Sequence, residues 1–124
     1  MPYAAYKLMH FVGIFMLITA FAATSMHVLR GGSRADNPYR RVFGIVHGVA
    51  ALLILTGGFG MLARMGVMHG GGLPNWIYVK LGIWVALAAA MTVPYLGRRY
   101  ARSALIAVPV LAVFAAATAL YKPF

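Results

Sequence analysis

The sequence predicts an all-α integral membrane protein, a four-helix up-down bundle with both termini on the extracytoplasmic side. Two observations carry the fold class. Of the 124 residues, 63% are hydrophobic and only 10% are charged, whereas a soluble domain is nearer half apolar and a quarter charged. The apolar residues also fall into four runs, each close to the roughly 20 residues that a helix needs to cross a bilayer.

We place the four spans at about 4–29, 40–64, 75–97 and 102–121, within one domain covering residues 1–124. The polar segment 31–38 separates the first two spans. The glycine-rich segment 70–75 separates the next two, and its Pro74 suits a helix start. A charged hairpin is expected at 98–102. Pro94 and Pro109 lie inside the last two spans and are expected to bend them.

The charge distribution predicts the orientation. The chain has a net charge of +10 and a single acidic residue, Asp36. Its basic residues cluster at the ends of apolar runs, which favours the lipid bilayer as partner over nucleic acid. Seven arginines fall on the side that holds loops 1–2 and 3–4: Arg30, Arg34, Arg40, Arg41, Arg98, Arg99 and Arg102. The positive-inside rule places that side in the cytoplasm of a bacterium, with the spans in its inner membrane.

Several kinds of chemistry lack the residues they need. The chain has no cysteine, which excludes disulfides and thiolate metal sites. No carboxylate lies inside a span, so catalysis by paired carboxylates is excluded there. The glycines at 57, 58 and 60 lie within a span rather than between a strand and a helix, so they do not form a phosphate-binding loop.

Ionisable groups at membrane depth are costly, and each is therefore a candidate site. The candidates are His10, His27, His47 and Lys80. At 1.5 Å per helical residue, His10 and Lys80 come out roughly level in the outer half of the bilayer, about 10 and 7 Å from its middle. His47 and His27 fall in the inner half, about 9 and 15 Å from the middle. His10 and His47 are thus too far apart to bind one metal ion.

Glycines near two of these histidines allow two interpretations. Gly13 shares a helix face with His10, and Gly44 shares one with His47. A porphyrin bound by a helical histidine needs a wall without bulky side chains, but small residues also let helices pack closely in lipid. His10 itself fits either a ligand or a hydrogen bond to another helix. Lys80 fits either a functional role or a side chain that extends toward the outer surface.

Methionines offer a copper site as a weaker alternative. Met61, Met65, Met68 and His69 lie on the same outer side as Met9 and His10. Thioether and imidazole ligands suit Cu(I), although methionine is also a common filler of apolar helices.

Three short stretches resemble a known family. They are Tyr6-Lys7-Leu8-Met9-His10-Phe11-Val12-Gly13, Trp76-Ile77-Tyr78-Val79-Lys80-Leu81 and the ending Tyr121-Lys122-Pro123-Phe124. They resemble the HemJ-type protoporphyrinogen oxidases and the related CopD-like four-helix membrane proteins. The resemblance implies a b-type haem, with His10 as the haem-associated histidine and Lys80 as the essential basic residue.

The leading hypothesis is therefore a membrane protein that binds haem b or a porphyrin and serves redox chemistry. Lys80 is its expected catalytic residue, and His10 its expected metal ligand. The cofactor would be held by His10, His47, His27, Gly13 and Gly44. The alternative is a cofactor-free accessory subunit of a larger respiratory or photosynthetic complex, or a homo-oligomer, in which these groups serve packing alone.

Overall fold

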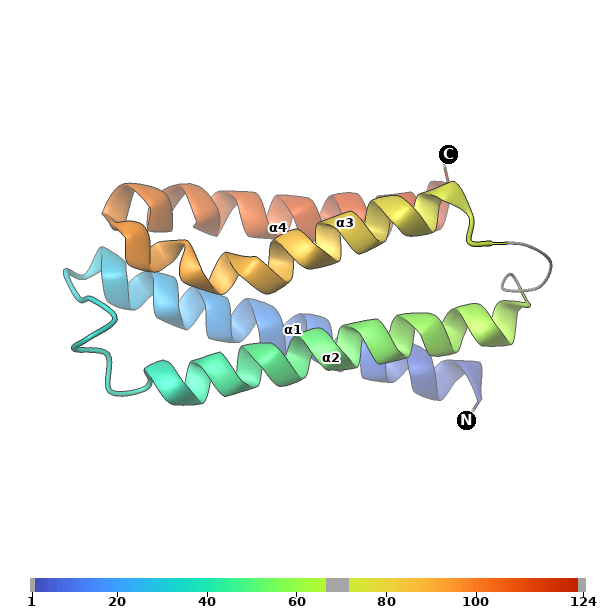
Figure 1. Ribbon diagram of the computed structural model, residues 1–124, viewed down its shortest axis with the longest axis horizontal. Coiled ribbons are helices and arrows are strands. Elements are labelled where there is room, and N and C mark those ends of the chain that lie inside the picture. Colours follow the sequence, from blue (N-terminus) through green and yellow to red (C-terminus); the bar gives the residue numbers. More distant parts are fainter. Residues whose placement is uncertain (1, 67–71, 123–124) are drawn as a thin grey trace.

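The computed structural model describes residues 2–66 and 72–122. It contains α1 (Tyr3–Leu29), α2 (Arg40–Met65), α3 (Asn75–Ala89) and α4 (Arg98–Tyr121), with two 3₁₀ turns, η1 (Ala90–Thr92) and η2 (Pro94–Leu96), between α3 and α4. The four helices lie lengthwise beside one another, and both ends of the chain lie at the same end of the molecule (Figure 1). No described residue is in a strand, so the all-α prediction is confirmed.

Four segments are long and apolar enough to cross a membrane: Tyr3–Leu29, Arg40–Met65, Asn75–Thr92 and Arg98–Tyr121. Large apolar side chains cover their outer surface, including Leu8, Phe15, Leu52, Val113 and Leu120, each more than 60% exposed. An exposed apolar surface of this extent is unfavourable in water and favourable against lipid tails. The prediction of a multi-pass membrane protein is therefore supported by composition, length and surface together.

The main hydrophobic core lies between all four helices. Its buried side chains come from α1 (Leu17, Phe21), α2 (Ala50), α3 (Ile83, Leu87) and α4 (Ala104, Val108), joined by Ala90 of η1. A second cluster of buried side chains, formed by Leu62, Trp76 and Ile77, lies near the end of α2 and the start of α3. A half-open cavity between the helices is lined by residues of both clusters.

The connection from α1 to α2 starts with a glycine-dependent helix end. Gly31 has a φ of 94°. Its N–H donates to the carbonyl of Val28, and the N–H of Gly32 donates to that of His27. This pair of bonds is the Schellman arrangement, which needs a left-handed residue at its centre. The run of two glycines thus ends α1 and turns the chain into the loop.

The third predicted span ends earlier than expected. We predicted helix to residue 97 with a bend at Pro94, but α3 ends at Ala89 and the chain continues as η1 and η2. Proline has no N–H to donate to the carbonyl four residues earlier. The chain instead forms hydrogen bonds that span three residues rather than four, such as that from the N–H of Val93 to the carbonyl of Ala90 at 3.1 Å.

The hairpin predicted at 98–102 is wrong. The chain turns at Gly97, whose φ of 146° is a conformation open to glycine. α4 then begins at Arg98, so all three arginines of this stretch are helical. α4 also continues through Pro109 as one helix.

Candidate functional site

α1 and α2 make the most extensive helix contact in the bundle, and glycines set its spacing. A Cβ atom on Gly57 would lie only 2.7 Å from the backbone nitrogen of His10, and one on Gly13 would lie 2.8 Å from the carbonyl oxygen of Ala50. Side chains larger than hydrogen would force the helices apart at both points. Gly13 therefore packs against α2, which is the helix-packing interpretation of this residue.

This close approach brings His10 within hydrogen-bond distance of the backbone of α2. The Nδ1 atom of His10 lies 2.7 Å from the carbonyl oxygen of Ile54. A carbonyl can only accept, so Nδ1 carries the proton and donates. In the neutral ring the other nitrogen, Nε2, then has a free lone pair, and the one hydrogen bond found for this side chain among the described residues is that of Nδ1. A backbone bond at Nδ1 is the arrangement that orients histidine ligands at metal sites.

His10 lines a cavity of about 470 Å³ that lies between the helices and is partly open to the surface of the bundle. The walls come from α1 (Leu17), α2 (Ile54, Gly58), α3 (Trp84) and α4 (Val108) among others, and they are mostly apolar. This volume falls within the range of about 300–1,000 Å³ typical of ligand pockets.

Three lysines line the same cavity: Lys7, Lys80 and Lys122. Lys80 is close enough to interact electrostatically with the His10 ring, and Lys122 with Lys80 in turn. The Nζ atom of Lys122 also lies 5.1 Å from the centre of the Trp76 ring. His10 and Lys80 thus line one cavity, and their equal depth in a membrane stays a prediction. The chemistry of the cavity is that of an apolar space with several basic groups and one imidazole.

Helices α4 and α3 both contribute side chains to the lining of this cavity. α4 presents a wall of small residues, Ala112, Ala115, Ala116 and Ala119. Trp84 of α3 also lines the cavity, and its indole Nε1–H donates to the carbonyl oxygen of Ala51 at 2.9 Å, which links α3 to α2. The wall without bulky side chains that a flat ligand needs is therefore supplied by alanines of α4 rather than by Gly13.

His27 and His47 do not line this cavity. His47 is only 4% exposed, and its Nε2 has no partner in the described part of the chain. His27 belongs to the loop, where its Nε2 lies 2.7 Å from Oδ1 of Asp36 and 3.0 Å from the carbonyl oxygen of Ser33. Both of those atoms accept, so Nε2 is the donor. His27 therefore has its partners in the loop, and a shared role of His27 and His47 in holding a cofactor stays a prediction.

Gly44 and Gly48 do not pack against another helix. A Cβ atom on either would meet nothing within 4 Å, so the small-residue pattern 44–48 is not a helix contact within this chain. Gly44 instead lines a groove near the first loop, remote in sequence from the cavity around His10.

The expected copper ligands are only partly described. Met61 and Met65 line the cavity with His10, whereas Met68 and His69 lie outside the described residues. Residues 2–66 and 72–122 contain no group of three or more His, Cys, Asp or Glu side chains that could hold a metal ion.

Gly57, Trp84 and the alanine wall were not among the predicted site residues. Gly57 was considered only for a phosphate loop, although its place in the outer half of the second span put it at the depth of His10. Trp84 and the alanines carried no usable signal, because such residues are frequent in any apolar helix.

No family model matches this chain, and neither the curated proteins nor the solved structures contain a match.

Proposed function

We propose that the protein binds b-type haem, or a free porphyrin, in the cavity beside His10. One observation carries the proposal: an imidazole whose Nδ1 is fixed by Ile54 and whose Nε2 is unpartnered among the described residues lines an apolar cavity that also holds three lysines. A porphyrin is a flat apolar ring with two carboxylates. Its ring matches the walls of the cavity, and its carboxylates match the basic groups.

The donor set fits the group. His10 would ligate the iron through Nε2, while the Ile54 carbonyl fixes the orientation and tautomer of the ring. Lys80 and Lys122 would bind the carboxylates, and the alanines of α4 leave space for the ring. When bound, haem would supply one-electron redox chemistry. The family resemblance suggests protoporphyrinogen oxidation as the reaction.

The decisive experiment is an absorption spectrum of the detergent-purified protein, oxidised and reduced, with and without added hemin. We expect a Soret band that H10A abolishes. The chain offers a matched pair for the cavity itself. Ala112 lines it, and Ala107 on the same helix is exposed and does not. A112F should block hemin binding and A107F should not.

The absence of any hemin-dependent band in folded wild-type protein would overturn this proposal and favour the cofactor-free accessory subunit. The basic groups have their own test. Exchanging Lys80 for Met should weaken hemin binding by about tenfold, the value of a charge-assisted hydrogen bond, and K80R should restore most of it. Binding of a porphyrin dimethyl ester, which has no carboxylates, should be unaffected by K80M.

Copper is a second candidate, favoured by Met61 and Met65 in the cavity with His10. The three lysines oppose it, because they repel a cation in the same space. Metal analysis after Cu(I) loading of the wild type and of the variant M61L/M65L distinguishes the two: a stoichiometric, methionine-dependent copper content would favour copper.

For the orientation, we propose that the arginine-rich end is cytoplasmic and that the chain sits in a bacterial inner membrane. The support is the distribution of basic residues, with seven arginines toward one end and Lys7, Arg64 and Lys122 toward the other. Alkaline phosphatase fused to the C-terminus should be active, and a fluorescent protein fused there that folds only in the cytoplasm should be dark.

A further inference from the structure

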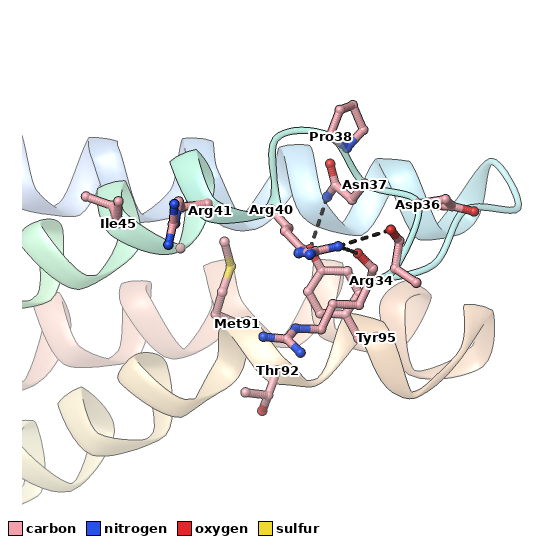
Figure 2. Close-up of a pocket in the computed structure, with 12 residues that line it drawn as sticks. Arg34, Asp36, Asn37, Pro38, Arg40, Arg41, Ile45, Met91, Thr92 and Tyr95 are labelled. Carbon is pink, nitrogen blue, oxygen red and sulfur yellow. Dashed lines mark hydrogen bonds between the residues drawn. The ribbon is translucent and has the colours of Figure 1, made fainter.

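A second hollow, of about 1,040 Å³, lies at the end of the bundle opposite to the chain termini. It is bounded by the loop between α1 and α2, by the first turns of α2 and by η1 and η2 (Figure 2). Neither His10 nor Lys80 lines it. This groove is therefore a separate feature of the molecule, and a ligand bound there is independent of the proposed haem site.

Three arginines line this groove, and two of them are available to a ligand. Arg40 is held by the loop, since its Nη1 donates to the carbonyl oxygens of Arg34 at 3.2 Å and Ala35 at 3.0 Å. The guanidinium groups of Arg34 and Arg41 have no hydrogen-bond or ion-pair partner within residues 2–66 and 72–122.

The acid that could neutralise these arginines is already engaged. Asp36 is the only Asp or Glu in the chain. Its Oδ1 accepts from the backbone N–H of Ser33 and from His27, both at 2.7 Å. Its carboxylate is turned away from the arginine side chains (Figure 2). The groove is thus left with uncompensated positive charge.

The groove is amphipathic along the direction of α2. Gly44 and Ile45 follow Arg41 by about one helical turn, or roughly 5 Å toward the middle of the bundle, and Met91 of η1 lines the same groove. Ile45 is an exposed apolar side chain, and Gly44 leaves the floor open because a Cβ atom there would meet nothing within 4 Å. The positive charge at the loop matches the headgroup of an anionic lipid. The apolar surface one helical turn deeper matches its acyl chain.

We propose that this groove binds the phosphate headgroup of an anionic membrane lipid. The phosphate contacts Arg34 and Arg41, and the first part of an acyl chain lies over Gly44 and Ile45 beside Met91. Arginine suits this role because its planar fork can donate two hydrogen bonds to one phosphate, and basic pockets between helices at a membrane surface bind lipid headgroups in the same way.

The test is native mass spectrometry of the full chain released from mixed micelles containing equal amounts of phosphatidylglycerol and phosphatidylcholine. We expect one retained phosphatidylglycerol and a preference for it that falls at least tenfold in R34A/R41A, given about 1 kcal/mol for each basic residue near a lipid headgroup. R99A/R102A is the matched control. It removes the same charge from the same end of the molecule but from outside the groove, and it should keep the preference.

The apolar part has its own pair of variants. G44L places a side chain into the groove and should reduce lipid retention, whereas G48L adds the same side chain to open space on α2 outside the groove. Equal losses in R34A/R41A and R99A/R102A would show only diffuse surface charge and would overturn the proposal. Displacement of the lipid by millimolar inorganic phosphate would also overturn the proposal. It would show that the site binds oxyanions in general and that the acyl chain does not contribute to binding.

Discussion

The Nδ1 atom of His10 lies 2.7 Å from the main-chain oxygen of Ile54, so one side chain links α1 to the backbone of α2 at the wall of the cavity between the helices. The bond has a structural use, since it joins two helices, and a chemical one, since it leaves Nε2 free. The two uses can be separated by mutation.

The substitution His10→Asn should keep the hydrogen bond between the helices and remove the free ring nitrogen. An Asn side-chain amide can donate to the Ile54 carbonyl in place of Nδ1, but it has no counterpart of the free Nε2. We expect H10A to lower the free energy of unfolding by about 1 kcal/mol, the scale of helix-to-helix hydrogen bonds in membranes, and H10N to recover most of that loss. Unfolding in mixed SDS micelles measures both.

Hemin titration of the same two variants then separates the roles. Both should lack the spectrum of imidazole-bound haem. A wild-type spectrum from H10N would show that His10 is only a link between helices.

Two adjacent glycines should respond oppositely to alanine. A Cβ atom on Gly57 would lie 2.7 Å from the backbone of both Tyr6 and His10, whereas one on Gly58 would meet the His10 ring at an ordinary 3.5 Å. G57A should therefore destabilise the bundle by about 1–3 kcal/mol through overpacking. G58A should be neutral or slightly stabilising, because alanine favours helix. Thermal unfolding in detergent provides the comparison, and equal midpoints for G57A and G58A would contradict the close approach of α1 and α2.

The loop between α1 and α2 should depend on a single tyrosine of η2. The backbone N–H of Tyr39 donates to Oδ1 of Asn37, which leaves Nδ2 of Asn37 to donate to the hydroxyl of Tyr95 at 3.0 Å. Asn37 is only 4% exposed. Losing this partner in Y95F should cost about 1–2 kcal/mol and speed cleavage of the loop by trypsin at its arginines.

Y100F is the matched control for Y95F, because Tyr100 is exposed on α4 and removal of its hydroxyl should be silent. Faster cleavage in both variants would mean that the tyrosines affect the loop in a general way and that the Asn37 bond does not hold it.

Acid should loosen the same loop through its one carboxylate. The pKa of Asp36 is lowered from its ordinary value, first by the backbone N–H of Ser33 and then by the hydrogen bond from His27. A group whose pKa is lowered by folding contributes stability above its unfolded pKa and loses that contribution as the pH falls through its folded pKa. The loss is therefore expected below about pH 4.

D36N provides the reference, because it cannot titrate. Trypsin is inactive at that pH, so pepsin cleavage or thermal midpoints across the acid range are the measurements. The wild type should become more labile in acid and D36N should be nearly flat. A parallel decline of the two proteins would assign the acid sensitivity to other groups.

Much of the fold could be predicted because lipid imposes a simple rule on sequence. A helix that crosses a bilayer must be long and apolar, and the starts and ends of the first two spans came out within about one residue of the structure. The third span was misjudged at its end, since a proline in lipid can bend a helix or end it. Whether the helix bends or ends depends on whether the turn before the proline can form 3₁₀ hydrogen bonds. It does so here, where the N–H of Val93 donates to the carbonyl of Ala90.

The candidate site could be predicted only in part. Depth counting brought His10 level with Lys80, because helical rise is constant. It could not assign partners to His27 and His47, because partners depend on which way each helix face is turned. The copper ligands Met68 and His69 stay a prediction, as does the resemblance carried by Pro123 and Phe124, because these residues lie outside the described ranges.

The sequence by itself determined that the chain forms four apolar helices with its arginines gathered toward one end, and it predicted an imidazole and a lysine at one depth. These properties follow from composition and from one-dimensional spacing. Only the tertiary structure decided that Gly57 rather than Gly44 sets a helix contact, that the Ile54 carbonyl accepts a hydrogen bond from His10, and that alanines of α4 leave a cavity open. Those outcomes depend on how each helix is rotated about its axis and on how closely two helix backbones approach each other. Hydropathy encodes neither.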